Sequence, residues 1–358
     1  MTGIADDPYL PQRNPWLFGQ ETAERALLAA WNSGRLPHAW LLTGPRGVGK
    51  ATLAYRFARF VLSDGAAGGM FAAREGLATE PGAAGARLVA SGSHPDLRLV
   101  TRTANDQGRL RQEIVVGDVR GLGQFLRLTS GAGGWRIAII DQADDLNRNA
   151  ANALLKVLEE PPERSLLLMT SHSPGRLLPT IRSRCRTLPL APLPADALAT
   201  ALRRLRPEIA DDAVPSLAVL ADGAIGRAVT LADIDGVAAW RDLVALFAQW
   251  PRIDLPPMTA WVDRFARAAQ GEGFAIAGEL LLLWLSRIAT LSAGRPAPEA
   301  VAGEGAVARR LADGARLDRW VALWEKTGDL LARADGLDLD RRHVLLSALL
   351  AFDPAVRR

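Results

Sequence analysis

The sequence contains very little cysteine and lysine. Among its 358 residues Cys185 is the single cysteine, which excludes an internal disulfide and a cysteine-rich zinc cluster. Three of the 43 basic residues are lysines (Lys50, Lys156 and Lys326), so the positive charge comes almost entirely from arginine. The formal net charge is only +4. A charge this small permits contact with nucleic acid but does not by itself indicate it.

Long hydrophobic runs are also missing. The longest stretch of aliphatic residues and tryptophan, 280–285, lies between Glu279 and Arg287. A membrane span needs about 20 apolar residues, so we expect no membrane-spanning helix and no membrane partner. The first residues carry acids and prolines where a secretory signal would have an apolar segment. The sequence therefore predicts a cytoplasmic protein.

Residues 1–189 alternate short apolar runs with helical patterns. The runs are too short and too apolar for surface helices, and strands that alternate with helices predict an α/β domain with a mostly parallel sheet. Predicted strands cover 40–43, 137–140 and 166–170, and predicted helices cover 52–62, 118–128 and 149–160. Within this domain, 63–93 is rich in Gly and Ala without a clear period, so we expect a loose insertion there.

The remainder of the chain is predicted to be helical. A proline-containing linker at 190–194 precedes two or three short helices, which form a small domain over 190–235. From 236 to 358 helical patterns follow one another without strand-like alternation, which favours a helical bundle. The predicted domains are therefore 1–189, 190–235 and 236–358.

A glycine-rich segment follows the first predicted strand and precedes a helix. It has the pattern G-x-x-x-x-G-K, in which Gly44, Gly47, Gly49 and Lys50 are the characteristic residues. Glycines let backbone N–H groups surround phosphate oxygens, the lysine adds a positive charge, and the helix N-terminus adds its dipole. The segment therefore predicts a phosphate loop that binds ATP.

Two positions of this nucleotide site depart from the pattern of an active ATPase. Ala51 follows the lysine where a Ser or Thr hydroxyl would bind Mg²⁺, and Thr52 stands one position late, which turns its side chain by about 100° around the helix. The strand 137–140 ends at Asp141, the position of a magnesium-binding acid. Gln142 follows it and cannot take a proton from water. We therefore predict that the chain binds ATP weakly or not at all and does not hydrolyse it alone.

Two longer motifs resemble the clamp-loader ATPase family: NALLKVLEEPP at 152–162 and LPTIRSRC at 178–185. Shorter similar segments lie at 18–20, 34–39 and 223–228, so the resemblance covers residues 16–230. The resemblance implies an α/β P-loop domain of the AAA+ type, a small helical lid and an all-α collar that joins a hetero-oligomeric ring.

The resemblance also implies roles for individual residues. Arg184, in the Ser-Arg-Cys segment, corresponds to an arginine finger that reaches the γ-phosphate of ATP held by a neighbouring subunit. Arg227 corresponds to the second nucleotide sensor, and either Thr170 or Ser171 corresponds to the first. The implied ATP-binding residues are Gly44, Gly47, Gly49, Lys50, Thr52, Asp141 and Arg227.

A zinc module is expected to be absent. Many members of the family carry four cysteines after the first helix of the domain, but the 63–93 insertion contains none. His94 alone cannot build a tetrahedral site. We therefore predict neither zinc nor another metal bound by a dedicated set of side chains.

The resemblance leaves two main functions open, and a third, more remote one is another AAA+ ATPase that acts on DNA. In the first, the chain is a stationary subunit of the DNA polymerase III clamp loader that supplies Arg184 to a gamma/tau neighbour. Its partners are then the gamma/tau and delta subunits, the sliding clamp and primed DNA. In the second, the chain is a gamma/tau-like motor that hydrolyses ATP with Lys50, Thr52 and Asp141. Ala51 and Gln142 favour the first function.

Overall fold

The fold is described from a computed structural model in which the chain forms two compact units. The structure describes residues 9–352 apart from 64–74, 81, 107, 109, 129–133, 253, 267–271 and 338. Unit 1 comprises Met1–Ala201 and Gly223–Arg227, and unit 2 comprises Leu202–Asp222 and Ala228–Arg358. The division at 189 and 235 remains a prediction.

Unit 1 is built on a five-stranded parallel sheet with the order β2-β3-β4-β1-β5. Its strands are β1 (Ala39–Thr43), β2 (Leu97–Val100), β3 (Arg136–Ile140), β4 (Ser165–Ser171) and β5 (Arg186–Pro189). The predicted α/β class is confirmed. The apolar runs identified β1, β3 and β4, whereas β2 and β5 were missed because they are short and partly exposed edge strands.

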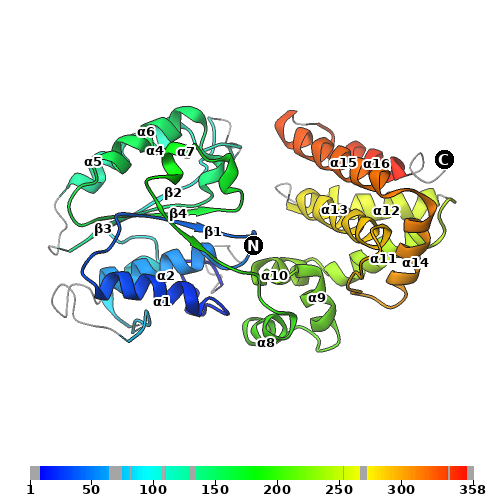
Figure 1. Cartoon of the computed structure of the whole chain (residues 1–358), viewed down its shortest axis with the longest axis horizontal. Coiled ribbons are helices and arrows are strands. Elements are labelled where there is room, and N and C mark those ends of the chain that lie inside the picture. Colours follow the sequence, from blue (N-terminus) through cyan, green and yellow to red (C-terminus); the bar gives the residue numbers. More distant parts are fainter. Residues whose placement is uncertain are drawn as a thin grey trace. The chain divides into compact units, whose positions relative to one another are not determined.

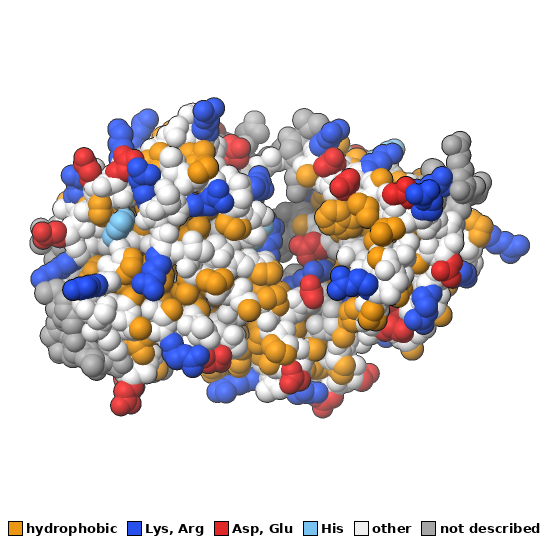
Figure 2. Space-filling model, viewed as in Figure 1, with side chains coloured by type: hydrophobic (Ala, Val, Ile, Leu, Met, Phe, Trp, Pro, Cys, Tyr) orange, Lys and Arg blue, Asp and Glu red, His pale blue; other side chains and the backbone are white. Residues whose placement is uncertain are grey.

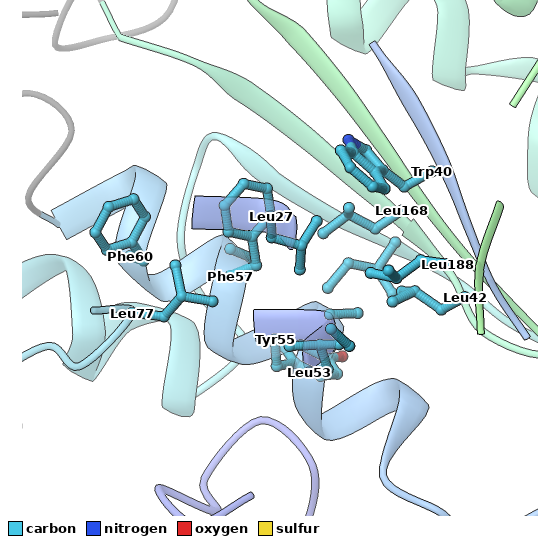
Figure 3. Packing of buried hydrophobic residues seen from close by; sticks show 14 of the residues in the cluster. Leu27, Trp40, Leu42, Leu53, Tyr55, Phe57, Phe60, Leu77, Leu168 and Leu188 are labelled. Carbon is cyan, nitrogen blue, oxygen red and sulfur yellow. The ribbon is translucent and has the colours of Figure 1, made fainter. Parts of the chain in front are cut away.

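Helices cover both faces of this sheet (Figure 1). One face carries α1 (Glu21–Asn32) and α2 (Lys50–Ser63), and the other carries α4 (Val116–Arg120), α5 (Leu122–Arg127), α6 (Arg148–Glu159) and α7 (Pro179–Arg182). Successive strand residues point to opposite faces. Trp40 and Leu42 therefore join the α1–α2 core with Leu27 and Phe57 (Figure 3), while Leu41 joins the core beneath α4–α7.

Two predicted segments of unit 1 differ from the structure. The helix expected over 118–128 is divided at Gly121, where the Arg98 guanidinium lies so near that a Cβ atom would be 3.1 Å away. The insertion contains α3 (Ala84–Ala90), which packs against α2 through buried residues such as Val89. The prediction of a loose insertion is therefore wrong for the residues of α3. Residues 64–74 and 81 of the insertion lie outside the described residues.

The rest of the chain is helical, as predicted. The helices are α8 (Ala195–Leu205), α9 (Ala213–Ala221), α10 (Ile225–Asp233), α11 (Gly236–Ala248), α12 (Leu255–Ala266), α13 (Glu272–Ser292), α14 (Glu304–Gly314), α15 (Leu317–Leu337) and α16 (Arg341–Leu350). In the described part of the chain after Pro189 there is no strand. The fold is therefore an α/β domain with a parallel sheet, followed by a part in which the described residues form helices.

Helix α13 is more apolar than its longest uninterrupted run suggests. By length and composition Gly273–Ser292 could cross a membrane, and half of that window is buried in the structure. The uninterrupted run 280–285 is flanked within the helix by glycine, alanine, serine and threonine residues, which are also compatible with an apolar helix. The helix packs against α12, α14 and α15, as a core helix of unit 2 does. The absence of a membrane partner stays a prediction.

A buried ion pair joins three helices of unit 2. Arg287 of α13 pairs with Glu304 at the start of α14, and their side chains are only 5% and 2% exposed. The second carboxylate oxygen of Glu304 accepts hydrogen bonds from the Trp240 indole at 2.9 Å and the Ala300 backbone at 2.8 Å. The Arg287 guanidinium also lies over the Trp240 ring, 4.8 Å from its centroid. The buried carboxylate of Glu304 is therefore paired and hydrogen-bonded where α11, α13 and α14 meet.

Charged side chains are mixed on the surface. On the face shown in Figure 2, Lys and Arg side chains are scattered among acidic and hydrophobic ones. This distribution agrees with the small net charge of +4.

Candidate functional site

The predicted phosphate loop connects β1 to α2 at the carboxyl end of the sheet. Gly44, Gly47 and Gly49 have φ angles of 143°, 79° and 100°. A Cβ atom on Gly44 would lie 2.4 Å from the carbonyl oxygen of Leu190, and one on Gly47 would lie 2.8 Å from the backbone nitrogen of Arg227. Side chains therefore have no room at these two positions, and the loop requires glycine there.

The Lys50 ammonium group is held by the loop itself. It donates hydrogen bonds to the carbonyl oxygens of Gly44 at 2.8 Å and Pro45 at 2.6 Å, and the residue is 9% exposed. Burial lowers the pKa of Lys50 to about 8, although Asp141 and Asp144 act in the opposite direction. The ammonium group thus makes two of its three possible hydrogen bonds within the loop itself.

The start of α10 closes over the loop within unit 1. The backbone N–H of Gly226 donates a hydrogen bond to the carbonyl oxygen of Gly47 at 2.8 Å. Arg227 follows directly and is half-buried. The structure thus brings Arg227 beside the phosphate loop, although the two segments are far apart in the sequence.

Asp141 is linked to the end of β4 by a hydroxyl group. The Thr170 hydroxyl donates to Asp141 Oδ1 at 2.7 Å and accepts from the backbone N–H of Gln142 at 2.8 Å. Gln142 has a left-handed conformation with φ of 58°. Of the two candidate sensors, Thr170 is therefore the one in contact with Asp141.

Ser171 contacts a different carboxylate, which the sequence analysis did not identify. Asp144 accepts hydrogen bonds from the Ser171 hydroxyl at 2.6 Å, the His172 backbone at 2.7 Å and His172 Nδ1 at 2.7 Å. Burial favours the neutral acid, but the bonds from His172 and Ser171 outweigh it and hold the pKa of Asp144 well below its usual range. His172 Nε2 in turn lies 3.5 Å from Arg46 of the loop.

The predicted site residues therefore fall into two groups. One group gathers at the carboxyl ends of the strands: Gly44, Gly47, Gly49, Lys50, Thr52 in the first turn of α2, Asp141 and Arg227. The other is Arg184, which precedes β5. The structure does not bring Arg184 to the phosphate loop of its own chain.

Arg184 lies near the amino end of the sheet. In the parallel register Trp40 is opposite Arg186 and Thr43 is opposite Pro189, so the loop after Thr43 is at least about 10 Å further along the strands. Arg184 Nη2 lies 2.9 Å from Glu159 Oε1, and Nη1 donates to the Thr180 carbonyl oxygen at 3.1 Å. Its side chain is 35% exposed. Arg184 can therefore present donors to another molecule at this edge.

Cys185 should react slowly with thiol reagents while the chain is folded. Burial raises the pKa of its thiol to about 12, and the side chain packs against the core beneath α4–α7. At pH 8 the folded protein then holds about a thousandfold less thiolate than the unfolded chain. A chromogenic disulfide reagent with and without denaturant measures this difference. Labelling of the folded protein at the denatured rate would contradict it.

Comparison with known proteins identifies similar sequences for the first part of the chain. Residues 19–194 match the family model described as DNA polymerase III, delta subunit. The DNA polymerase III subunit delta' of Pseudomonas aeruginosa is 37% identical over 194 residues, covering 52% of this chain and 53% of that protein. Its Escherichia coli counterpart is 32% identical over 217 residues, covering 61% and 60%. The tau subunit of Bacillus subtilis is 27% identical over 231 residues, covering 63% and 38%.

A parallel sheet with a glycine-rich G-K loop after β1 defines an α/β domain of the P-loop class, and over residues 19–194 this part of the chain is similar to subunits of DNA polymerase III. Over this region the chain is similar to the delta' subunits of DNA polymerase III. The matched region spans between 53% and 60% of the length of the two delta' relatives.

Proposed function

We propose that this chain is a stationary, non-hydrolysing subunit of the DNA polymerase III clamp loader and supplies Arg184 to the ATP site of a gamma/tau neighbour. The observation that carries the proposal is the separation of Arg184 from its own phosphate loop. An arginine near the amino end of the sheet cannot assist phosphoryl transfer at the carboxyl end. It acts only on a nucleotide held by another subunit.

The features of the chain's own nucleotide site support the same proposal. The loop has the glycines of a phosphate loop, but the Lys50 ammonium group is engaged by two loop carbonyls. Ala51 offers no hydroxyl for Mg²⁺, and Gln142 offers no base for water. ATP therefore binds weakly here, with Thr170 as the first sensor through its contact with Asp141 and Arg227 as the second.

The proposed role defines the partners. The gamma/tau and delta subunits form the ring with this chain, and the assembled ring places the sliding clamp on primed DNA. The relatives named as delta' and tau subunits of DNA polymerase III support this assignment. The subunit acts in the cytoplasm. It binds no zinc.

The purified chain is expected to show no ATP turnover above background, because it lacks both the magnesium-binding hydroxyl and the base. Phosphate release at saturating MgATP measures turnover, and calorimetry measures binding. The variant Ala51→Thr/Gln142→Glu, which restores both groups, serves as the comparison and is expected to bind MgATP more tightly.

The alternative is a gamma/tau-like motor. The similarity to the tau subunit, together with Lys50, Thr52 and Asp141 at the carboxyl end of the sheet, favours it. Robust turnover by the purified chain that Lys50→Ala abolishes would establish the motor and reject the stationary role.

A further inference from the structure

The guanidinium of Arg184 is held at two points by its own chain. Glu159, the last residue of α6, lies 2.9 Å from Nη2, and the Thr180 carbonyl oxygen in α7 accepts from Nη1 at 3.1 Å. An arginine has five N–H donors in a planar fork. Two bonds leave three of these donors, and the side chain remains 35% exposed.

We infer that Glu159 is a positioning residue for Arg184: its carboxylate fixes the guanidinium so that the remaining donors face the neighbouring subunit's nucleotide. This inference rests on the proposed function, in which Arg184 acts in trans. A free arginine side chain occupies many rotamers, and each must be given up when it meets a phosphate. A guanidinium that is already oriented loses less freedom and reaches the productive geometry more often.

The helix that carries Glu159 is a rigid support. The Asn147 side chain caps α6 by accepting from the backbone of Ala150 at 2.9 Å, and Leu154 and Leu158 are buried in the core beneath α4–α7. The helix also packs against α7, which carries Thr180. Both contacts of the guanidinium therefore come from elements whose mutual position is fixed by packing.

Helix stability alone does not account for an acidic residue at this position. The C-terminus of a helix carries partial negative charge, so Glu159 in the last turn of α6 is electrostatically unfavourable for the helix. The pair with Arg184 is also half-exposed, and such ion pairs contribute little to folding. The contact is better explained by the orientation that it imposes on Arg184.

The chain offers a matched control in the next residue. Glu160 pairs with Arg127 at 3.8 Å, and these two side chains are 83% and 63% exposed. Replacing Glu160 removes the same charge from the same end of α6 without touching Arg184. Any effect of general electrostatics at this surface would therefore appear in both variants.

The test uses a loader assembled from the full chain with gamma/tau and delta, in the presence of clamp and primed DNA. The quantity measured is Arg184-dependent ATP turnover, which is the part that the Arg184→Ala loader lacks. Glu159→Ala should lower its kcat by about threefold to tenfold, and Glu159→Gln should lie between Ala and wild type. The KM for ATP should stay unchanged because the neighbour binds the nucleotide, and Glu160→Ala should match wild type.

A double variant separates positioning from other roles. Glu159→Ala should cause no further loss in a loader that already carries Arg184→Ala, and size-exclusion chromatography should show the same assembly for every variant. Wild-type turnover with Glu159→Ala, or a loss that persists without Arg184, would overturn the inference and leave the proposed function standing. Wild-type turnover with Arg184→Ala would instead reject the proposed function.

Discussion

A loader assembled with Arg184→Ala should lose nearly all ATP hydrolysis at the one site that this subunit faces. An arginine finger accelerates phosphoryl transfer by about 10³ to 10⁵, because its fixed charge offsets the charge that develops on the transferred phosphate. Arg184 keeps its guanidinium at an exposed edge, far from its own loop. We therefore expect turnover at the neighbouring site to fall by at least about a thousandfold.

Single-turnover phosphate release from the loader, with clamp and primed DNA present, measures this loss at individual sites. Arg182→Ala is the matched control, because Arg182 is an exposed residue of α7 and carries the same charge two positions earlier. Both variants should assemble like wild type. An equal loss of turnover in the two variant loaders would show that hydrolysis depends on positive charge near this edge and not on Arg184 itself.

Replacing Glu304 by alanine should have the largest effect on the stability of unit 2. Removal of one member of a buried ion pair leaves the other charge without compensation and destabilises a protein by about 3 to 5 kcal/mol. Here Arg287 would lose its carboxylate, and the Trp240 indole and the Ala300 backbone would lose their acceptor. The free energy of unfolding should therefore fall by at least about 3 kcal/mol.

Urea unfolding followed by tryptophan fluorescence measures this change, since six of the ten tryptophans lie after residue 202 in unit 2. Glu299→Ala is the control: it breaks an exposed pair with Arg309 at 3.9 Å and should change stability by no more than about 0.5 kcal/mol. A similar small change for Glu304→Ala would mean that Arg287 finds water or another acceptor.

The central part of the sheet could be predicted from the sequence because it is buried on both faces. Parallel strands covered by helices consist of continuous apolar residues, and β1, β3 and β4 have this character. The phosphate loop was equally evident, because its glycines and Lys50 stand at a fixed spacing between an apolar strand and a helix. Both signals are local, so no knowledge of distant contacts was needed.

Features that depend on contacts between distant segments could not be predicted. At the break at Gly121, Arg98 of the edge strand β2 donates a hydrogen bond to the Gly121 carbonyl oxygen at 3.4 Å. The bonds of Asp144 to Ser171 and His172 exist because β3 and β4 are paired in register. No spacing in the sequence indicates such a contact.

The same limit applies to the two side chains on which the functional account depends. The G-K pair predicts that Lys50 faces a phosphate, but the hydrogen bonds to its own loop follow from the folded path of Gly44 and Pro45. The Ser-Arg-Cys motif identifies Arg184 but not its ion-pair partner, because Glu159 belongs to a separate motif.

The central claim is that this chain supplies an arginine to a neighbour's site and does not use its own phosphate loop for hydrolysis. ATP turnover by two assembled loaders tests it most directly, one with Arg184→Ala and one with Lys50→Ala in this subunit. The account predicts that Arg184→Ala removes hydrolysis at the neighbouring site and that Lys50→Ala leaves turnover at the wild-type rate. Loss of turnover with Lys50→Ala together with normal turnover in the Arg184→Ala loader would contradict it.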